Sequence, residues 1–191
     1  PYEFIHSTIP GNNIIKQSVA TCKPLSRSYF KMIEICKMMG LLENMPEIMN
    51  SFHLAEGPGG FIEALALMRS QIRDNYIGMT LINDDDKNVP GWRKSRQFLS
   101  NNPNVYIERG IDNKGDLTNP ENLSYCYEKY KNSMNLITGD GGFDFSMDFN
   151  QQELFISKLL FAQSAYALSI QRIGGTFILK IFDAFMRHTI D

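Results

Sequence analysis

Cysteine is scarce in this sequence of 191 residues and occurs only as Cys22, Cys36 and Cys126. An odd, widely spaced set builds neither a disulfide framework nor a zinc knuckle, so we expect free thiols and a reducing, intracellular compartment. The three histidines stand singly, which is more typical of structural residues than of metal ligands. We therefore expect no metal site.

An excess of one charge and a long apolar run are also missing. Nineteen Lys and Arg residues face 21 Asp and Glu residues, so any polyanion site has to be a local patch. Five basic residues form one candidate patch or simply a solvated helix face: Lys16, Lys23, Arg27, Lys31 and Lys37. The longest apolar stretch, 159–170, is interrupted by Gln163 and is shorter than the roughly 20 residues of a membrane span. With no signal peptide either, we expect no membrane partner.

The hydrophobic share of 43% is sufficient for one substantial core. We expect one domain over 26–191, an N-terminal extension over 1–25, and a longer protein around both, because the chain starts at Pro1 and ends at Asp191 after a strand-like run. Hydrophobic periodicity predicts helices at 26–39, 61–70, 123–130 and 153–173, the first capped by Ser26. It predicts strands before the turn at 55–60 and at 77–82, 104–108, 135–138 and 176–182. Alternating strands and helices indicate an α/β fold with a mostly parallel sheet covered on both faces.

The most informative segment is 53–61, which reads His-Leu-Ala-Glu-Gly-Pro-Gly-Gly-Phe. A strand runs into this glycine turn, and a helix follows at once. Gly57, Gly59 and Gly60 permit positive φ and carry no Cβ, so backbone can approach a ligand, and free N–H groups at the helix start favour negative charge. We interpret the segment as a nucleotide or nucleoside cradle; glycines that merely end a strand are the alternative.

The glycine spacing limits which classes of ligand the turn could bind. A dinucleotide site requires G-x-G-x-x-G, but Ile62 stands at the place of the third glycine, and no Lys-Ser/Thr pair of a P-loop follows Gly60. A nicotinamide oxidoreductase is therefore the weaker enzyme alternative.

Two charged residues fall at the ends of other predicted strands. Asp140 follows an apolar strand and precedes two glycines, and Lys180 lies within the apolar run 177–182. Each has an ordinary alternative: Asp140 as a turn or capping residue, Lys180 as a strand lysine that reaches solvent. Ligands collect at the carboxyl ends of parallel strands, so we expect Asp140, Lys180 and the glycine turn to converge. A lysine beside a carboxylate in such a crevice can accept a proton from a hydroxyl.

Six segments, in order, resemble the FtsJ/RrmJ-type RNA 2′-O-methyltransferases, and most closely the mRNA cap ribose methyltransferases of eukaryotes and large DNA viruses. They are 26–31, 56–61, 78–81, 115–118 with 120–122, 140–143 and 174–183. Each motif is moderately specific, and six in the right order are strong. The resemblance implies a Rossmann-like, SAM-dependent methyltransferase domain that lacks its last strands in this chain.

The resemblance also implies site residues. Of the family's Lys-Asp-Lys-Glu tetrad, the first three members fall on Lys31, Asp140 and Lys180, whereas the glutamate would lie beyond the end of this chain. S-adenosylmethionine would lie over the glycine turn, Asp116 would hold the adenine amino group, and the catalytic step would need no metal. The implied cofactor-binding residues are Glu56, Gly57, Pro58, Gly59, Gly60, Phe61, Asp116 and Asp140.

The implied partner is RNA, with the 5′ end of capped mRNA as the expected substrate. RNA phosphates would meet Lys31 and also Lys23, Arg27 or Arg187. Candidates for stacking on the cap guanine are Tyr2, Phe4, Tyr29, Phe143, Phe145 and Phe149, with packing in the core or on the surface as the alternative for each. The expected compartment is the cytoplasm or the nucleus, or a viral factory or virion for a viral protein. A ribosomal RNA methyltransferase and an inactive scaffold domain are the alternatives.

Overall fold

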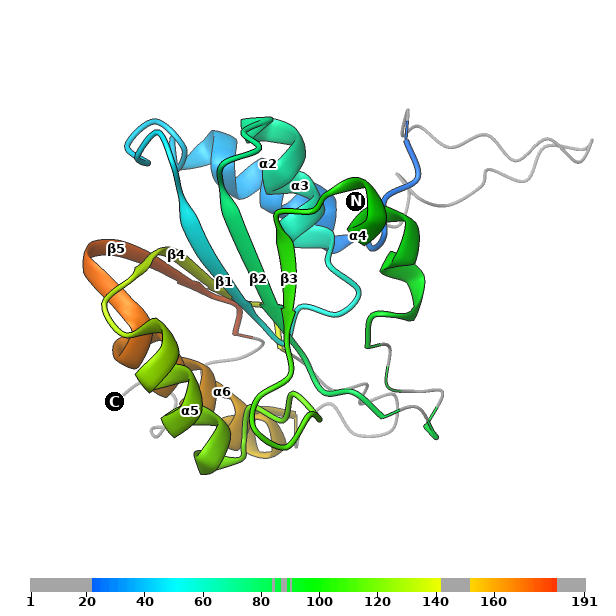
Figure 1. Cartoon of the computed structure of the whole chain (residues 1–191), viewed down its shortest axis with the longest axis vertical. Helices are drawn as coiled ribbons and strands as arrows, with labels where there is room; N and C mark the ends of the chain where they lie inside the picture. Colours follow the sequence, from blue (N-terminus) through cyan, green and yellow to red (C-terminus); the bar gives the residue numbers. More distant parts are fainter. Residues whose placement is uncertain (1–21, 84, 87–88, 90, 142–151, 182–191) are drawn as a thin grey trace, which may run out of the picture.

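The structure of the protein, a computed structural model, describes residues 22–83, 85–86, 89, 91–141 and 152–181. Helices and strands alternate along these residues (Figure 1). In chain order the elements are α2 (Ser28–Met38), β1 (Asn50–Leu54), α3 (Gly60–Arg69), β2 (Asn75–Met79), η1 (Arg93–Ser95), α4 (Arg96–Asn101), β3 (Val105–Glu108), α5 (Pro120–Tyr130), β4 (Met134–Gly139), α6 (Gln152–Ile170) and β5 (Gln171–Leu179).

The five strands form one parallel sheet in the order β3-β2-β1-β4-β5. His53 of β1 lies opposite Gly78 of β2 on one side and Thr138 of β4 on the other. The chain moves outward from β1 to β3 and then returns to β4, so the strand order reverses between β1 and β4. In open α/β sheets, ligands bind beyond the carboxyl ends of the strands at this switch point.

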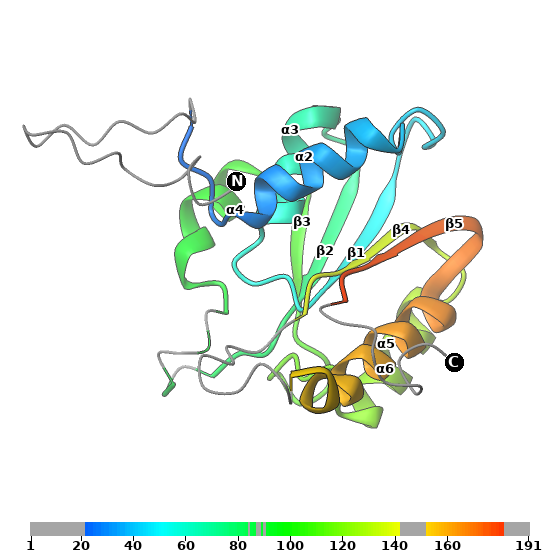
Figure 2. The same cartoon turned by 180° about the vertical axis from the view of Figure 1, so that it is seen from behind.

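Helices cover both faces of the sheet, as predicted. Helices α2, α3 and α4 lie on one face and α5 and α6 on the other (Figures 1 and 2). The first face buries a core around Met32 and Leu65, and the second a core around Phe52 and Tyr166. Successive strand residues point to opposite faces, which is why Phe52 and Leu54 enter the second core while Ser51 and His53 turn toward the first face.

The α/β fold is confirmed, and the differences lie at element boundaries. Ser26 does not cap α2: the N-cap is Arg27 without a side-chain cap, and the Ser26 hydroxyl instead contacts that of Ser28 at 2.5 Å. Strand β5 begins at Gln171 rather than at 176 and ends at Leu179, so Lys180 follows the strand instead of lying within it. The helical segment η1–α4 was not predicted.

The state of the three cysteines agrees with the prediction from the sequence. Cys22 is exposed, Cys36 and Cys126 are buried, and all three are free, as predicted. Over the described ranges, no group of His, Cys, Asp and Glu side chains is arranged to hold a metal ion. No helix in this part of the chain is both long and apolar enough to span a bilayer.

Candidate active site at the carboxyl ends of the strands

The glycine turn joins β1 to α3 as predicted. Its glycines were expected to let a ligand approach, but neighbouring segments of the protein pack against two of them. Only Gly59 of the three has positive φ, at 107°. A Cβ at Gly57 would lie 2.5 Å from the carbonyl oxygen of Gly91, and a Cβ at Gly60 would lie 2.2 Å from the hydroxyl of Ser26. The turn thus lacks side chains mainly because other protein segments pack against it.

Glu56 occupies the start of α3. Its Oε1 accepts the N–H of Phe61 at 2.5 Å. The side chain is 3% exposed, and burial raises its pKa well above the usual range; the backbone N–H groups of Phe61 and Ile62 and the charge of Lys180 oppose this rise, and the Asp140 carboxylate adds to it. The Phe61 N–H, one of the groups expected to be free for an anionic ligand, is therefore already bound by an internal carboxyl group.

The carboxyl group of Glu56 at the start of α3 affects which class of ligand the turn can bind. A pyrophosphate bound at a helix start needs the free backbone N–H groups and the positive end of the helix dipole. Here Glu56 takes one of those donors, the Phe61 N–H, and when ionised adds negative charge. The turn consequently suits a ligand with a positive group better than a dinucleotide.

Asp140 and Lys180 converge at the ends of β4 and β5, as predicted. The Lys180 ammonium lies 2.5 Å from Asp140 Oδ1 and donates to the Asp140 carbonyl oxygen at 3.0 Å. Main-chain bonds fix both residues, since Asp140 N–H donates to Leu54 and Lys180 N–H donates to Gly139. Both charged side chains are mostly buried, and their charges reach the Glu56 carboxyl group. Three predicted site residues therefore form one cluster.

Lys31 reaches the same end of the molecule from another element. It is half-buried in the first turn of α2, and the start of this helix packs directly on the glycine turn, where Tyr29 N would lie 2.9 Å from a Cβ at Gly60. The structure gives Lys31 no direct contact with Asp140 or Lys180 in the described part of the chain. Tyr29 is buried in the core, which agrees with the packing alternative and leaves it unexposed for stacking on a cap base.

Asp116 lies in the loop that follows β3, beside the end of β2. Its Oδ1 accepts bonds from the backbone N–H and the hydroxyl of Thr118, both at 2.8 Å. Gly115, with φ of 64°, brings this loop against Thr80, because a Cβ there would lie 2.2 Å from the Thr80 carbonyl oxygen. Asp116 thus stands at the same edge of the sheet as the glycine turn, with Oδ2 unbonded within the described residues.

Two residues that contact this edge of the sheet were not predicted from the sequence to do so. Trp92 lies over the glycine turn and over β2, 3.3 Å from a Cβ at Gly59 and 2.3 Å from one at Gly78. Gln163 of α6 accepts the N–H of Gly141 at 3.2 Å, next to Asp140. The single tryptophan, and a glutamine inside the apolar run 159–170, were the available signals. The remaining candidates Tyr2, Phe4, Phe143, Phe145, Phe149 and Arg187 lie outside the described residues.

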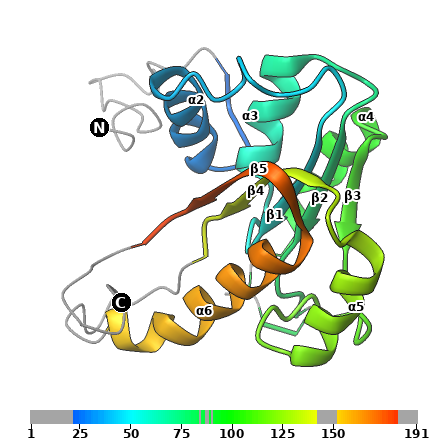
Figure 3. The same cartoon turned by 90° about the vertical axis from the view of Figure 1, so that its left-hand side faces the viewer.

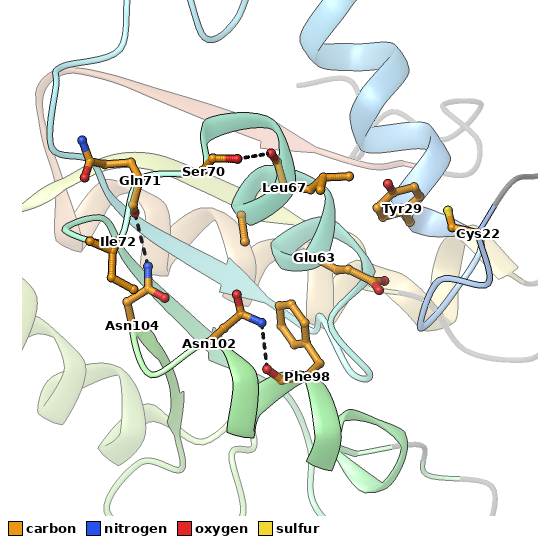
Figure 4. A pocket seen from close by; sticks show the side chains of 11 residues that line it. Cys22, Tyr29, Glu63, Leu67, Ser70, Gln71, Ile72, Phe98, Asn102 and Asn104 are labelled. Atoms are coloured by element: carbon orange, nitrogen blue, oxygen red, sulfur yellow. Dashed lines mark hydrogen bonds between the residues drawn. The ribbon is translucent and has the colours of Figure 1, made fainter.

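A separate groove of about 530 Å³ lies between α3 and α4. Figure 4 shows Glu63 and Leu67 of α3 facing Phe98 and Asn102 of α4 across it, with Cys22 at one end. None of the predicted catalytic residues lines this groove. The candidate active site is therefore the cluster at the strand ends and not this groove.

The sequence of nearly the whole chain matches one protein family. Residues 24–190 match the profile described as FtsJ-like methyltransferase. The chain belongs to the FtsJ-like methyltransferase family. The family predicted from the motifs is thus confirmed.

Curated relatives of this FtsJ-like chain carry a single description, cap-specific mRNA (nucleoside-2′-O-)-methyltransferase 1. The Homo sapiens protein is 34% identical over 145 residues, which cover 73% of this chain and 17% of that protein. The Trypanosoma cruzi protein is 36% identical over 135 residues, covering 68% and 35%. The Ailuropoda melanoleuca protein is 29% identical over 191 residues, covering 97% and 22%. The chain therefore spans from about a sixth to about a third of these relatives.

A solved structure has a similar fold. It is described as a ribosomal RNA methyltransferase from Plasmodium falciparum, and it superposes with a TM-score of 0.57 at 19% identity. The match covers 84% of this FtsJ-like chain and 79% of that one. At this identity the likeness concerns the fold alone.

Proposed function

We propose that this FtsJ-like domain transfers a methyl group from S-adenosylmethionine to a ribose 2′-hydroxyl of RNA, in the first nucleotides of capped mRNA. The observation that carries the proposal is the Lys180–Asp140 ion pair beside the Glu56 carboxyl group at the sheet's switch point. The description shared by the curated relatives supports the choice of capped mRNA.

The side chains at the carboxyl ends of the strands suit S-adenosylmethionine as the cofactor. Glu56 offers a buried carboxyl oxygen without a partner in the described chain, which suits a ligand that carries a positive group. Asp116 has an unbonded oxygen for an amino group such as that of adenine. We assign cofactor binding to these two residues, to Asp140 and to the turn at 57–61. S-adenosylmethionine, when bound there, supplies an electrophilic methyl group.

The protein's own part in the reaction is positioning and handling one proton. The Lys180 amine, in its neutral form, would contact the ribose 2′-hydroxyl and take up its proton as the methyl carbon bonds to the 2′-oxygen and its bond to sulfur breaks, with the sulfur keeping that electron pair. Asp140 would hold the Lys180 side chain in place and stabilise the ammonium that forms, and Lys31 would add positive charge that faces the RNA phosphates. Holding the reactants in line can lower the barrier by up to about 7–11 kcal/mol, so we expect geometry to contribute more than acid catalysis.

Replacing Lys180 tests this assignment. We expect Lys180→Ala to reduce methyl transfer to a capped RNA by roughly 10²- to 10⁴-fold, the range for loss of a positioned proton-transfer group. Binding of S-adenosylhomocysteine should persist, because Lys180 is assigned to the acceptor and not to the cofactor. Isotope transfer to RNA and calorimetric binding measure the two effects, and Lys158→Ala, which changes an exposed lysine of α6, is the matched control.

Two outcomes would contradict the proposal. Unchanged transfer by Lys180→Ala would leave an inactive scaffold or another catalytic group as the explanation. The same assay with an uncapped transcript of identical sequence distinguishes the second candidate, a ribosomal RNA methyltransferase, which is how the structural neighbour is described. We expect transfer to require the cap; equal transfer to both RNAs would favour that second candidate.

A further inference from the structure

Gln163 is a polar residue of α6 whose side chain is completely buried. Burying an amide group costs free energy unless it is hydrogen-bonded, and both ends of this amide have partners. Oε1 accepts the N–H of Gly141 at 3.2 Å, and Nε2 donates to the carbonyl oxygen of Leu159, also at 3.2 Å. The second bond stays within α6, whereas the first crosses to the segment that follows β4. Gln163 therefore ties this helix to the strand end that carries Asp140.

The glycines on either side of Asp140 leave the space that this amide group fills. A Cβ at Gly139 would lie 2.5 Å from Gln163 Oε1, and a Cβ at Gly141 would lie 3.0 Å from both Oε1 and Nε2. Neither glycine has positive φ, so the backbone conformation does not require glycine at these positions. Their missing side chains instead let Gln163 approach the backbone before and after Asp140.

The peptide group between Asp140 and Gly141 is held at both of its polar ends. Its N–H donates to Gln163, and its carbonyl oxygen accepts a bond from Lys180 Nζ at 3.0 Å. A bond to the N–H fixes the plane of the peptide group, and it makes the carbonyl oxygen a better acceptor because linked hydrogen bonds polarise one another. Gln163 thus acts on Lys180 through a single peptide group.

We propose that Gln163 is a positioning residue that fixes the peptide group after Asp140 and, through it, the Lys180 amine beside the ribose 2′-hydroxyl. This inference rests on the proposed function. Lysine has a flexible four-carbon side chain, so one contact does not define where its nitrogen lies. Asp140 provides two acceptors, its carboxylate at 2.5 Å and its carbonyl oxygen. The carbonyl oxygen gives a fixed direction only while the peptide plane is held, and Gln163 holds it from α6.

Two substitutions separate the hydrogen bond of Gln163 from its packing. Methionine in Gln163→Met has a similar length but no oxygen for the Gly141 N–H. A buried carboxyl group favours its neutral form, so the carbonyl oxygen in Gln163→Glu can accept the Gly141 N–H while its hydroxyl donates to Leu159. We expect Gln163→Met to lower kcat for transfer to capped RNA about 10- to 100-fold, because a misplacement of about 1 Å can cost 10²-fold. Gln163→Glu should keep kcat within about threefold of the wild type, since the acceptor is retained.

Comparing kcat with binding separates positioning from general damage to the fold. KM for RNA and the affinity for S-adenosylhomocysteine should change less than about twofold in both variants, because Gln163 is assigned to neither ligand. The stoichiometry of calorimetric binding gives the fraction of folded protein to which kcat is referred. The matched control is Ala167→Gly, one turn further along α6, which weakens the same helix within the second core. Ala167→Gly should keep the kcat of the wild type.

Hydrogen exchange of the Gly141 amide tests the contact without an assay of activity. We expect slow exchange in the wild type and in Gln163→Glu, and exchange at least about tenfold faster in Gln163→Met, because the amide then lacks its acceptor. The wild-type measurement stands even where Gln163→Met does not fold. Rapid exchange of this amide in the folded wild type would overturn the inference.

Three kinetic results would also overturn it. They are an unchanged kcat in Gln163→Met, an equal loss in Gln163→Met and Ala167→Gly, and a loss in Gln163→Glu as large as that in Gln163→Met. The methyltransferase proposal survives each of these results, because it is tested at Lys180. If a wild type that binds S-adenosylhomocysteine transfers no methyl group to RNA, the proposed function fails and this inference fails with it.

Discussion

Burial gives two side chains of the β1 segment unusual protonation. His53 lies inside the sheet with Nδ1 2.8 Å from the Thr138 hydroxyl and Nε2 2.8 Å from the Ser51 hydroxyl. Burial lowers the pKa of His53 to about 3, whereas it raises the pKa of Glu56. Burial therefore disfavours the charged form of both groups in the folded protein.

The buried histidine predicts how stability depends on pH. Unfolded His53 titrates near pH 6.5, so between that pH and about 3 the unfolded chain binds a proton that the folded chain does not. Stability from this residue is present above pH 6.5 and is lost as the pH falls. Between pH 7 and pH 5 we expect the wild type to lose about 2 kcal/mol more of its free energy of unfolding than His53→Gln does. Urea titrations at both pH values measure this, and equal losses would contradict it.

Single residues were predictable from the sequence where a charge stood out from its surroundings. Lys180 within an apolar run and Asp140 after an apolar strand both indicated a site, and they meet as expected. Glu56 was expected at the cofactor site, but its contact with the start of α3 was missed, because nothing in the sequence reveals that this carboxyl group accepts the Phe61 N–H. For Tyr29 the sequence left stacking and packing as alternatives, and its burial decides for packing.

At the level of elements, glycines set how closely helices and loops approach the strands. Gly78 of β2 lies beneath Trp92, whose ring carbon would be 2.3 Å from a Cβ there, with Ile62 of α3 also within contact distance. The loop after β2 is thus anchored over the sheet by one indole ring. This loop also carries Gly91, which packs on the glycine turn.

A double-mutant cycle tests this anchor. We expect Gly78→Ala to destabilise the wild type by about 1–3 kcal/mol, because the added methyl group has no space under the indole ring. In a Trp92→Leu background the same change should cost clearly less, since the smaller side chain leaves room. The difference between the two costs, from urea unfolding of the four proteins, is the coupling energy. Additive costs would show that the methyl group is accommodated without moving Trp92.

Periodicity predicted most elements because their apolar faces are regular, and it failed where packing overrides the pattern. The first part of β5 contains Arg172, Gly174 and Gly175 and is mostly exposed, so it lacks the apolar signature of a strand although it pairs with β4. The short helix α4 buries none of its residues fully and gives a weak signal. The start of α5 at Pro120, in contrast, has a readable cap, since the Asn119 side chain accepts the Glu121 N–H.

At the scale of the whole molecule, the sheet has two unequal edges. Strand β3 at one edge has four residues, whereas β5 at the other has nine and pairs with β4 alone in the described part of the chain. Helix α6 runs directly into β5 at this edge (Figure 3). Near this junction, Leu168 of α6 is 86% exposed and Ile173 of β5 is 92% exposed.

Long edge strands with apolar neighbours favour pairing with another chain. We therefore expect the 191-residue chain to self-associate as its concentration rises, and the double change Leu168→Lys with Ile173→Lys to shift it toward the monomer by adding charge at this edge. Leu67→Lys is the matched control, because this leucine of α3 is 62% exposed and lines the α3–α4 groove instead. Sedimentation velocity over a concentration series measures the change. A wild type that stays monomeric throughout, or a control that dissociates as readily as the double variant, would place the association elsewhere than at β5.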